Sequence, residues 1–470
     1  MVSQPRLVIA GTRSGDGKTT VATGLMAALR ATGLRVSAHK VGPDYIDPGY
    51  HAVATGWPGR NLDPFLVGED LIAPLFRHGA GPADVSVIEG VMGLFDGAVG
   101  RGDFASTAHV ARLLAAPIVL VVSAAGAGRS IAATVHGFAS FDPRVRVAGV
   151  VLNRVSTPRH EDILRAALTD LGVPVLGALP AETELHAPSR HLGLIPVAER
   201  AAQVRDWLPR LRELVARHLD LDRLLAIARS APALTATPWS PDAAVARPAR
   251  VAVAAGRAFT FGYSEHRELL EAAGAEVAEF DPMTDEHLPA GCGALIAGGG
   301  FPEVYAADLA ANAVLRAEVR QRAAEGLPVI AECGGLLWLG ADLDGHEQCG
   351  VLPASARMTG RLTLGYREAV AAAGSPLAPA GSTIRAHEFH RTASQPASGA
   401  SPAWRLPDGR TQGWAGDRLL ASYLHVHWAG VPGVAARLLA AACAPSSISG
   451  PLVSLEQHQR PTGVVAGRES

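Results

Sequence analysis

Residues 11–20 read GTRSGDGKTT; they follow the apolar run Leu7–Ala10 and precede an Ala- and Leu-rich segment. This order is typical of a strand, a glycine-rich turn and the start of a helix. Glycines let backbone N–H groups converge on phosphate oxygens, and a helix N-terminus adds a favourable dipole. Lys18 would neutralise phosphate charge, and Thr19 would bind Mg²⁺. The stretch therefore predicts a nucleotide phosphate site on a P-loop-type parallel sheet.

The spacing of this loop departs from the strict motif. Thr12 stands where the first glycine belongs, and Gly11 lies one residue earlier. The alternative is a glycine-rich turn without a ligand, but strand, loop, Gly-Lys-Thr and helix follow in the right order for the phosphate site. The residues predicted to bind the nucleotide are Gly11, Thr12, Gly15, Asp16, Gly17, Lys18, Thr19, Thr20 and Lys40.

Short apolar runs alternate with helical patterns along most of the chain, which favours βαβ units and α/β domains. We predict a first domain over 1–231, closed by a helical region at 197–231, and a second over 249–445. A Pro-, Ala- and Ser-rich stretch, 232–248, indicates a linker, and 446–470 a flexible tail. The expected strands are Leu7–Ala10, Val36–Lys40, Val85–Glu89, Ile118–Val122, Val147–Leu152, Val175–Leu179, Arg250–Ala254, Glu276–Phe280, Ala294–Ala297, Pro328–Ala331 and Ala421–His425.

Composition narrows the class of protein. The 470 residues exceed a usual single core, and 48% apolar with 18% charged residues is typical of globular chains. A net charge of −2 gives no basic field for nucleic acid or a membrane surface. The four cysteines form no Cys-x-x-Cys pair, which argues against zinc ribbons and fits a reducing cytosol. The chain enters a strand at once, without a signal-peptide layout, so we expect a cytoplasmic protein.

Carboxylates follow two of the strands expected in the first domain. An apolar strand ends in Glu89, and the loop Lys40–Pro48 follows another strand end. Since carboxyl ends of parallel strands meet at the binding crevice, we expect Glu89, Asp44 and Thr19 to bind the metal ion. The alternatives are a capping or surface acid at Glu89 and an Asp/Pro turn at Asp44 and Asp47.

A second site is indicated by residues 327–339, LPVIAECGGLLWL. Cys333 lies on a tight turn between a strand and a helix, where the helix dipole favours the thiolate and small neighbours permit the turn. A buried structural cysteine is the alternative. Gly299 and Gly300, in a Gly-Gly-Gly run after another strand, are expected to offer backbone N–H groups to an oxyanion.

The base for this thiol is expected from the stretch SYLHVH, residues 422–427. His425 and His427 are two residues apart, so in a strand they would point the same way. One of them could take the proton of Cys333 and the other could support it; a metal-binding His-x-His pair is the rival. A further candidate cluster is His387–His390, HEFH.

Taken together, these residues make the chain resemble the cobyrinic acid a,c-diamide synthase family, the glutamine-dependent amidases of corrinoid biosynthesis. The resemblance covers about residues 5–440. It implies an ATPase domain similar to dethiobiotin synthetase, followed by a class I glutamine amidotransferase domain. Its specific stretches are Gly11–Thr20, Lys40–Pro48, Gly59–Pro64, Val87–Gly97, Gly298–Glu303, Glu332–Gly335, His387–His390 and Ser422–His427.

The resemblance also implies roles for residues. ATP would phosphorylate the a and c acetate carboxylates of the corrin ring, and ammonia from glutamine would replace the phosphate. Cys333 would form the glutamyl thioester with help from His425, whose place after Tyr423-Leu424 looks like that of the family's base. His427 stands where the usual triad has Glu, so the third triad member is open. The residues expected near the corrinoid are Asp44, Tyr45, Asp47 and Asp96.

Three rival functions account for part of the sequence. A partitioning ATPase would carry Lys where this chain has Arg13, and it would not need the domain of Cys333. Cobyric acid synthase amidates other side chains, and the stretches GPDYIDP and RNLDP look more like the a,c enzyme. The third rival is an a,c-diamidase of another tetrapyrrole. The expected partners are glutamine and a corrinoid acid, with a homodimer as one arrangement; cobalt-loaded and metal-free rings both stay open.

Overall fold

The computed structural model describes residues 4–181, 189–190, 193–241 and 248–444. The first domain is built on seven parallel strands in the order β3-β2-β4-β1-β5-β6-β7. The six longer strands confirm the sequence prediction, whereas β3 has only three residues and was missed. The bounds are β1 (Arg6–Gly11), β2 (Val36–Val41), β3 (Arg60–Leu62), β4 (Val85–Glu89), β5 (Ile118–Ser123), β6 (Val147–Val155) and β7 (Val175–Pro180).

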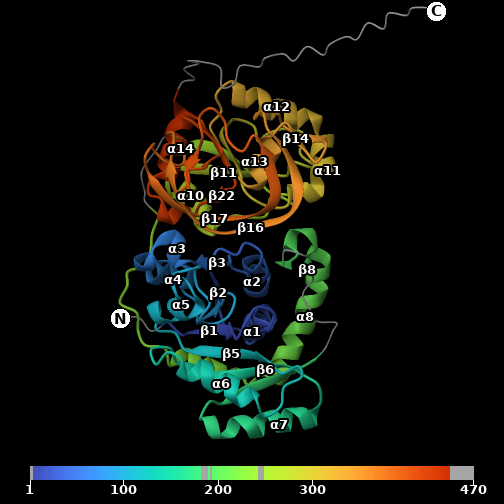
Figure 1. The fold of residues 1–470 in the computed structure, drawn as a ribbon, viewed down its shortest axis with the longest axis vertical. Helices are drawn as coiled ribbons and strands as arrows, with labels where there is room; N and C mark the ends of the chain where they lie inside the picture. Colours follow the sequence, from blue (N-terminus) through green and yellow to red (C-terminus); the bar gives the residue numbers. More distant parts are fainter. Residues whose placement is uncertain (1–3, 182–188, 191–192, 242–247, 445–470) are drawn as a thin grey trace, which may run out of the picture.

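Helices cover both faces of this sheet (Figure 1). Val8 packs in one core and Leu7 in the other, so β1 is apolar on both sides, as a central parallel strand is. Close packing of α1 on α8 explains Gly24, where a Cβ would lie 2.5 Å from Val215 Cγ2. The helices are α1 (Lys18–Ala31), α2 (Asp47–Thr55), α3 (Pro64–Val67), α4 (Ile72–Ala80), α5 (Thr107–Leu113), α6 (Ile131–Ser140), α7 (Pro158–Leu168), α8 (Ala201–His218) and α9 (Leu221–Arg229).

The helical region expected over 197–231 is interrupted. Leu219 leaves the helix to form an isolated bridge with Gly177 on β7, and Asp220 then caps α9 by accepting the N–H of Arg223 at 3.0 Å. The tail at 446–470 and residues 242–247 of the predicted linker lie outside the described residues, and the domain boundaries stay a prediction. Within the described chain, no helix combines the length and apolar character needed to cross a membrane.

The second domain contains a six-stranded sheet in the order β11-β10-β12-β13-β21-β20, parallel except for β20. It confirms the strands expected from Arg250 to Ala331. Its strands are β10 (Ala249–Ala254), β11 (Ala275–Phe280), β12 (Cys292–Ala297), β13 (Val329–Glu332), β20 (Trp414–Gly416) and β21 (Leu419–Ser422), and its helices are α10 (Ser264–Ala272), α11 (Ala306–Ala311), α12 (Ala313–Ala324), α13 (Gly334–Leu339) and α14 (Val434–Cys443).

A long antiparallel hairpin, β16 (Ser355–Ala371) and β17 (Thr383–Gln395), was not expected from the sequence. It lies in the middle of a separate sheet in the order β15-β14-β16-β17-β22, with β14 (Asp342–Leu343), β15 (His346–Glu347) and β22 (Leu424–His425). In this sheet His425 pairs with His387 of β17. The single strand expected over 421–425 is therefore two strands in different sheets. The chain changes sheet at Tyr423, between β21 and β22.

The hairpin faces the first domain, above β3 and α3 (Figure 1). The ring of Tyr366 stacks on Phe65 with centroids 4.3 Å apart, and its hydroxyl donates to Asp63 Oδ2 at 2.8 Å. Tyr263 Oη donates to Tyr45 Oη at 2.8 Å across the same interface. These contacts fix the loops after β2 and β3 against the second domain.

Candidate active sites

The loop between β1 and α1 wraps around the amino group of Lys18. Lys18 Nζ donates to the backbone oxygens of Arg13 at 3.1 Å and of Met92 at 2.6 Å. Burial, followed by the nearby ammonium of Lys40, lowers the pKa of Lys18. The loop therefore holds a buried cation at its centre, where it could offset phosphate charge.

Two glycines of this loop are required by its shape. Gly15 and Gly17 have φ angles of 85° and 99°, where other residues are strained. At Gly17 a Cβ would lie 2.1 Å from Asn153 Nδ2, which donates to the backbone oxygen of Asp16 at 2.8 Å. Asn153, at the end of β6, thus supports the loop from behind, and no local pattern marked it in the sequence.

Other residues predicted to bind the nucleotide hold the loop together. Asp16 Oδ2 accepts from the backbone N–H of Thr12 at 2.8 Å, from the Thr12 hydroxyl at 2.6 Å and from Arg13 N at 3.1 Å. The backbone oxygen of Gly11 accepts from Leu94 N at 2.9 Å. Thr20 lies half-buried in the first turn of α1. Asp16 therefore fixes the loop and faces inward.

A buried charge cluster lies beside the loop. Lys40 Nζ is 2.6 Å from Asp47 Oδ2 and 2.9 Å from Glu89 Oε1. The Thr19 hydroxyl donates to Glu89 Oε1 at 2.6 Å, and His51 Nε2 lies 2.6 Å from Glu89 Oε2. The structure thus brings Thr19, Lys40 and Glu89 together as the sequence predicts, and it adds His51, which was missed.

The charged groups of this cluster differ in the direction of their pKa shifts. Burial opposes ionisation of Glu89, but Lys40 and His51 outweigh it and lower its pKa. Burial likewise opposes the charge on Lys40, and Asp47 and Glu89 reverse that effect and raise its pKa. Burial, then Asp44 and Glu89, raise the pKa of Asp47. The raised pKa of Asp47 therefore indicates that the cations beside it do not fully offset the negative charge of Asp47 and Glu89 together.

Asp44 and Asp96, which are expected at the metal ion and the corrinoid, make hydrogen bonds within their own loops. Asp44 Oδ1 accepts from the backbone N–H groups of Ile46 at 2.8 Å and Asp47 at 2.9 Å, so it caps the turn into α2. Asp96 is exposed after β4, and its Oδ2 accepts from Gly93 N at 2.8 Å. No group of three or more His, Cys, Asp or Glu side chains within the described residues is arranged to hold a metal by itself.

The predicted thiol turn is confirmed. β13 ends at Glu332, Cys333 has φ 48° and ψ −96°, and α13 starts at Gly334. A non-glycine residue at this positive φ is strained, and such strain is common at functional sites. At Gly335 a Cβ would lie 2.0 Å from the backbone oxygen of Ala297, which explains the small neighbour that the turn requires.

The thiol itself is buried, and burial disfavours its charged form. Burial, followed by the carboxylate of Glu303, raises the pKa of Cys333. Its Sγ contacts the backbone oxygen of Phe389 on β17 at 3.7 Å. Because the thiolate is disfavoured in this state, the reaction needs a base beside the thiol.

Gly299 and Gly300 lie against the thiol turn. A Cβ at Gly299 would be 2.4 Å from His425 Cε1, and one at Gly300 would be 2.0 Å from the backbone oxygen of Ala258. A Cβ at Gly334 would be 3.1 Å from Gly300 N. The predicted oxyanion donors therefore lie between the imidazole and the turn, where only glycine fits.

His425 and His427 do not share a strand face, which corrects the expectation. β22 ends at His425, and His427 caps a short 3₁₀ turn. His425 Nδ1 is 3.9 Å from Glu332 Oε2, whereas His427 Nε2 is 3.5 Å from Glu265 Oε2 on α10. Burial, then three nearby histidines, lowers the pKa of His425 well below its ordinary value. A neutral imidazole next to the turn has the state of a general base.

The HEFH cluster borders this site on β17. His387 pairs with His425, and burial, followed by Arg367, lowers the pKa of His387 to about 4. His390 Nε2 lies 3.1 Å from Glu388 Oε1, and the His390 ring stacks on Tyr423 at 3.8 Å. The cluster therefore forms the wall of the thiol site.

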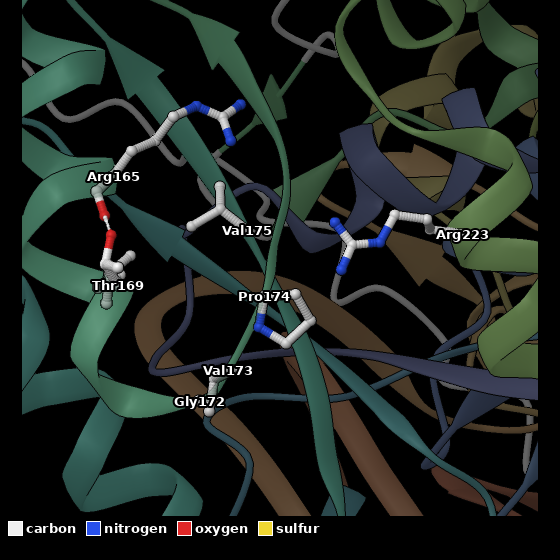
Figure 2. A pocket seen from close by; sticks show the side chains of 8 residues that line it. Arg165, Thr169, Gly172, Val173, Pro174, Val175 and Arg223 are labelled. Atoms are coloured by element: carbon white, nitrogen blue, oxygen red, sulfur yellow. Dashed lines mark hydrogen bonds between the residues drawn. The ribbon is translucent and has the colours of Figure 1, made fainter.

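One cavity borders the thiol turn, and another lies apart from the predicted sites. The first, of about 520 Å³, lies between α10 and the six-stranded sheet and is lined by Glu332, Gly298 and Phe261 among others. The other, of about 450 Å³, lies at the start of β7, and Figure 2 shows Arg165 and Arg223 on either side of it. The strands are parallel, so the start of β7 lies at the opposite end of the strands from the phosphate loop, which follows the end of β1. The second cavity is therefore separate from the predicted sites.

Comparison with known proteins agrees with this geometry. Residues 7–195 match the family model of the CobQ/CobB/MinD/ParA nucleotide binding domain, and residues 250–432 match that of the CobB/CobQ-like glutamine amidotransferase domain. A phosphate loop on one parallel sheet and a thiol turn on another thus define a nucleotide-dependent glutamine amidotransferase.

Whole-length relatives narrow the class. A hydrogenobyrinate a,c-diamide synthase of Streptomyces coelicolor is 55% identical, covering 93% of this chain and 97% of the relative. One of Mycobacterium tuberculosis is 52% identical, covering 93% and 98%. A cobyrinate a,c-diamide synthase of Gloeobacter violaceus is 44% identical, covering 94% and 98%. The chain belongs to the a,c-diamide synthase family.

Proposed function

We propose that this chain uses ATP and glutamine to amidate the a and c acetate carboxylates of hydrogenobyrinate, a step of cobalamin biosynthesis. The observation that carries the choice of substrate is the order of the relatives. Those at 52–55% identity are named hydrogenobyrinate enzymes, and those at 43–44% are named cobyrinate enzymes. A cytoplasmic location fits these substrates.

The residues of the first site fit ATP and Mg²⁺. ATP supplies a phosphoryl group that turns a substrate carboxylate into an acyl phosphate. Lys18 and the loop amides would bind the phosphates, and Thr19, Glu89 and Asp47 would offer oxygen ligands to Mg²⁺, which prefers carboxylates combined with phosphate oxygens. The loops after β2 and β4 would then bind the corrinoid through Asp44, Tyr45, Asp47 and Asp96.

The second site would release ammonia from glutamine. His425 takes the S–H proton, and Sγ of Cys333 attacks the carboxamide carbon. The backbone N–H groups of Gly299 and Gly300 would stabilise the negative oxygen that forms. The proton on His425 passes to the leaving nitrogen, so ammonia departs, and water then hydrolyses the thioester to glutamate. Ammonia displaces phosphate from the acyl phosphate at the first site.

Two measurements test this function. With ATP, Mg²⁺ and glutamine, hydrogenobyrinate should gain two amides, detected by mass, with a higher kcat/KM than cobyrinate. A higher value for cobyrinate would reverse the choice of ring, and no amidation of either would refute the function.

The variant Cys333→Ser separates the two sites. It should lose glutamine-dependent amidation and keep amidation from added ammonia, because only the thiol route is removed. A folded variant that loses both activities equally contradicts the separation.

A further inference from the structure

Two buried histidines at the domain junction each face one buried carboxylate. His425 Nδ1 lies 3.9 Å from Glu332 Oε2, and His427 Nε2 lies 3.5 Å from Glu265 Oε2. The exposed fraction of these four side chains does not exceed 9%. Since His427 replaces the usual triad carboxylate in sequence, one of these two carboxylates is the candidate to serve the thiol chemistry.

The His427–Glu265 pair belongs to the domain interface. Glu265 Oε1 accepts from Arg60 Nη1 at 2.7 Å, and Arg60 comes from β3 of the first domain. Arg60 also pairs with Glu268 on the same helix, α10. The ring of Tyr263 lies 4.3 Å from that of His427. Glu265 is therefore engaged in holding the two domains together.

The Glu332–His425 pair belongs to the thiol turn. Glu332 immediately precedes Cys333 and pairs with Ser422 between β13 and β21. Cys333 N donates to the backbone oxygen of Ser422 at 2.7 Å, and the chain reaches His425 three residues later. Two neighbouring strands therefore bring the thiol, the imidazole and the carboxylate to one place.

The side chain of Glu332 makes few other polar contacts among the described residues. Within the described chain, the hydrogen bond that it accepts comes from Val426 N, at 3.3 Å to Oε1. Burial raises the pKa of Glu332 to about 8 against this bond. A buried carboxyl that no nearby cation offsets costs folding free energy, and such groups concentrate at functional sites.

The two ring nitrogens of His425 have different surroundings, as a base held by a carboxylate requires. Nδ1 is on the side of Glu332, while Nε2 is buried and has no hydrogen-bond partner among the described residues. At 3.9 Å the pair is within ion-pair range and longer than a hydrogen bond, so it gains strength when the ring becomes a cation.

We propose that Glu332 is the positioning carboxylate of the glutaminase site and completes a Cys333–His425–Glu332 triad in place of the missing residue after the histidine. The proposal deepens the proposed function and rests on it. The S–H bond of Cys333 breaks as Nε2–H of His425 forms, and Sγ bonds to the carboxamide carbon. Glu332 holds the Nδ1–H and stabilises the imidazolium until its Nε2 proton leaves with ammonia.

The test compares Glu332→Gln with Glu265→Gln in the full chain. Glu332→Gln keeps the size of the side chain and removes its ability to carry a negative charge beside His425. It should lower kcat for glutamine hydrolysis by about 10²-fold or more, with KM for glutamine nearly unchanged and amidation from ammonia retained. Glu265→Gln, the matched buried carboxylate, should retain glutamine hydrolysis within about tenfold.

A second readout follows the thiol directly. Alkylation of Cys333 by iodoacetamide, measured by mass at that peptide across pH, reports the thiolate. In Glu332→Gln the alkylation profile should move to higher pH, because the imidazolium that accompanies the thiolate loses its counter-charge. Glu332→Asp keeps the charge with a shorter reach and should give an intermediate kcat if Glu332→Gln fails to fold.

The results of these experiments distinguish failure of the triad proposal from failure of the proposed function. Wild-type glutamine hydrolysis and an unmoved alkylation profile in Glu332→Gln would overturn the triad. A raised KM with unchanged kcat would overturn it too, since that result assigns Glu332 to glutamine binding. If the wild-type chain hydrolyses glutamine but amidates no corrinoid even with ammonia, the proposed function fails while the test of Glu332 still stands.

Discussion

The ring of Tyr45, in the loop after β2 of the first domain, lies 4.8 Å from the ring of His425 in the second. Tyr45 also stacks on Phe261 at 5.0 Å. The base proposed for glutamine hydrolysis therefore touches a loop proposed to bind the corrinoid. Occupancy of one site has a direct physical route to the other, through one aromatic side chain.

Tyr45→Ala should uncouple the two reactions. Without the ring, His425 loses its contact with the corrinoid loop, so glutamine hydrolysis should proceed without corrinoid. The ratio of glutamate released to amide formed should rise about fivefold or more, the lower range of measured site-to-site coupling. The control Tyr263→Phe removes the hydroxyl that Tyr45 contacts and keeps the rings. An unchanged ratio in Tyr45→Ala would remove the coupling role.

Lys18→Ala should lower amidation from both glutamine and ammonia by about 10²–10³-fold, because it removes the cation at the centre of the phosphate loop. ATP consumption and amide formation are measured together. Arg13→Ala is the control: its side chain is 77% exposed, and its backbone oxygen, which contacts Lys18, is retained. Near-normal rates in Lys18→Ala would move the phosphate site elsewhere.

Substitution of His425 and of His427 should affect the rate of glutamine hydrolysis differently. His425→Ala should lower glutamine hydrolysis by about 10²–10⁴-fold, the usual contribution of a general base, with amidation from ammonia retained. His427→Ala should instead lower the unfolding temperature, because Glu265 loses a partner at the domain interface. A larger kinetic defect in His427→Ala would exchange the roles.

Glu332 should also make stability depend on pH. Its pKa in the folded chain, about 8, is above the ordinary Glu value of about 4.3. Between these values the unfolded chain has lost the proton that the folded chain keeps, so stability falls as pH rises. The titratable groups that interact with this carboxyl are unchanged in Glu332→Gln; they are His425, Cys333, Tyr45 and Tyr263. That variant should gain unfolding temperature over the wild type between about pH 5 and about pH 9.

Thermal unfolding of both chains at the two pH values measures this gain. A variant that becomes progressively less stable than the wild type as pH rises would show that the carboxylate stabilises the fold. In that case its retention would have a structural reason, independent of glutamine hydrolysis.

The sequence correctly predicted the elements whose residues are contiguous in the chain. The strand before Gly11, the glycines and the helix at Lys18 are contiguous, as are Glu332, Cys333 and Gly334, so their order alone defines both turns. The parallel strands were recognisable because they are apolar on both faces.

Other features depend on contacts that no local pattern records. The hairpin β16–β17 is largely half-exposed and carries charges such as Arg367 and Glu368, so it lacks the clean alternation of a surface strand. The carboxylate partner of His427 comes from α10, far back in the chain. The sheet change at Tyr423 depends on pairing with β17, which the sequence of 421–425 does not contain.

Asp47 and Tyr45 are two positions apart, yet one contacts Lys40 beside the phosphate loop and the other contacts His425 beside the thiol. A loop built this way does not tolerate a change of length, because a single inserted residue would misplace one of the two side chains. For the same reason, replacing one domain of this enzyme by the corresponding domain of another enzyme is expected to fail. A chimera that joins this first half to a foreign amidotransferase half would inherit a Tyr45 with no matching surface to receive it.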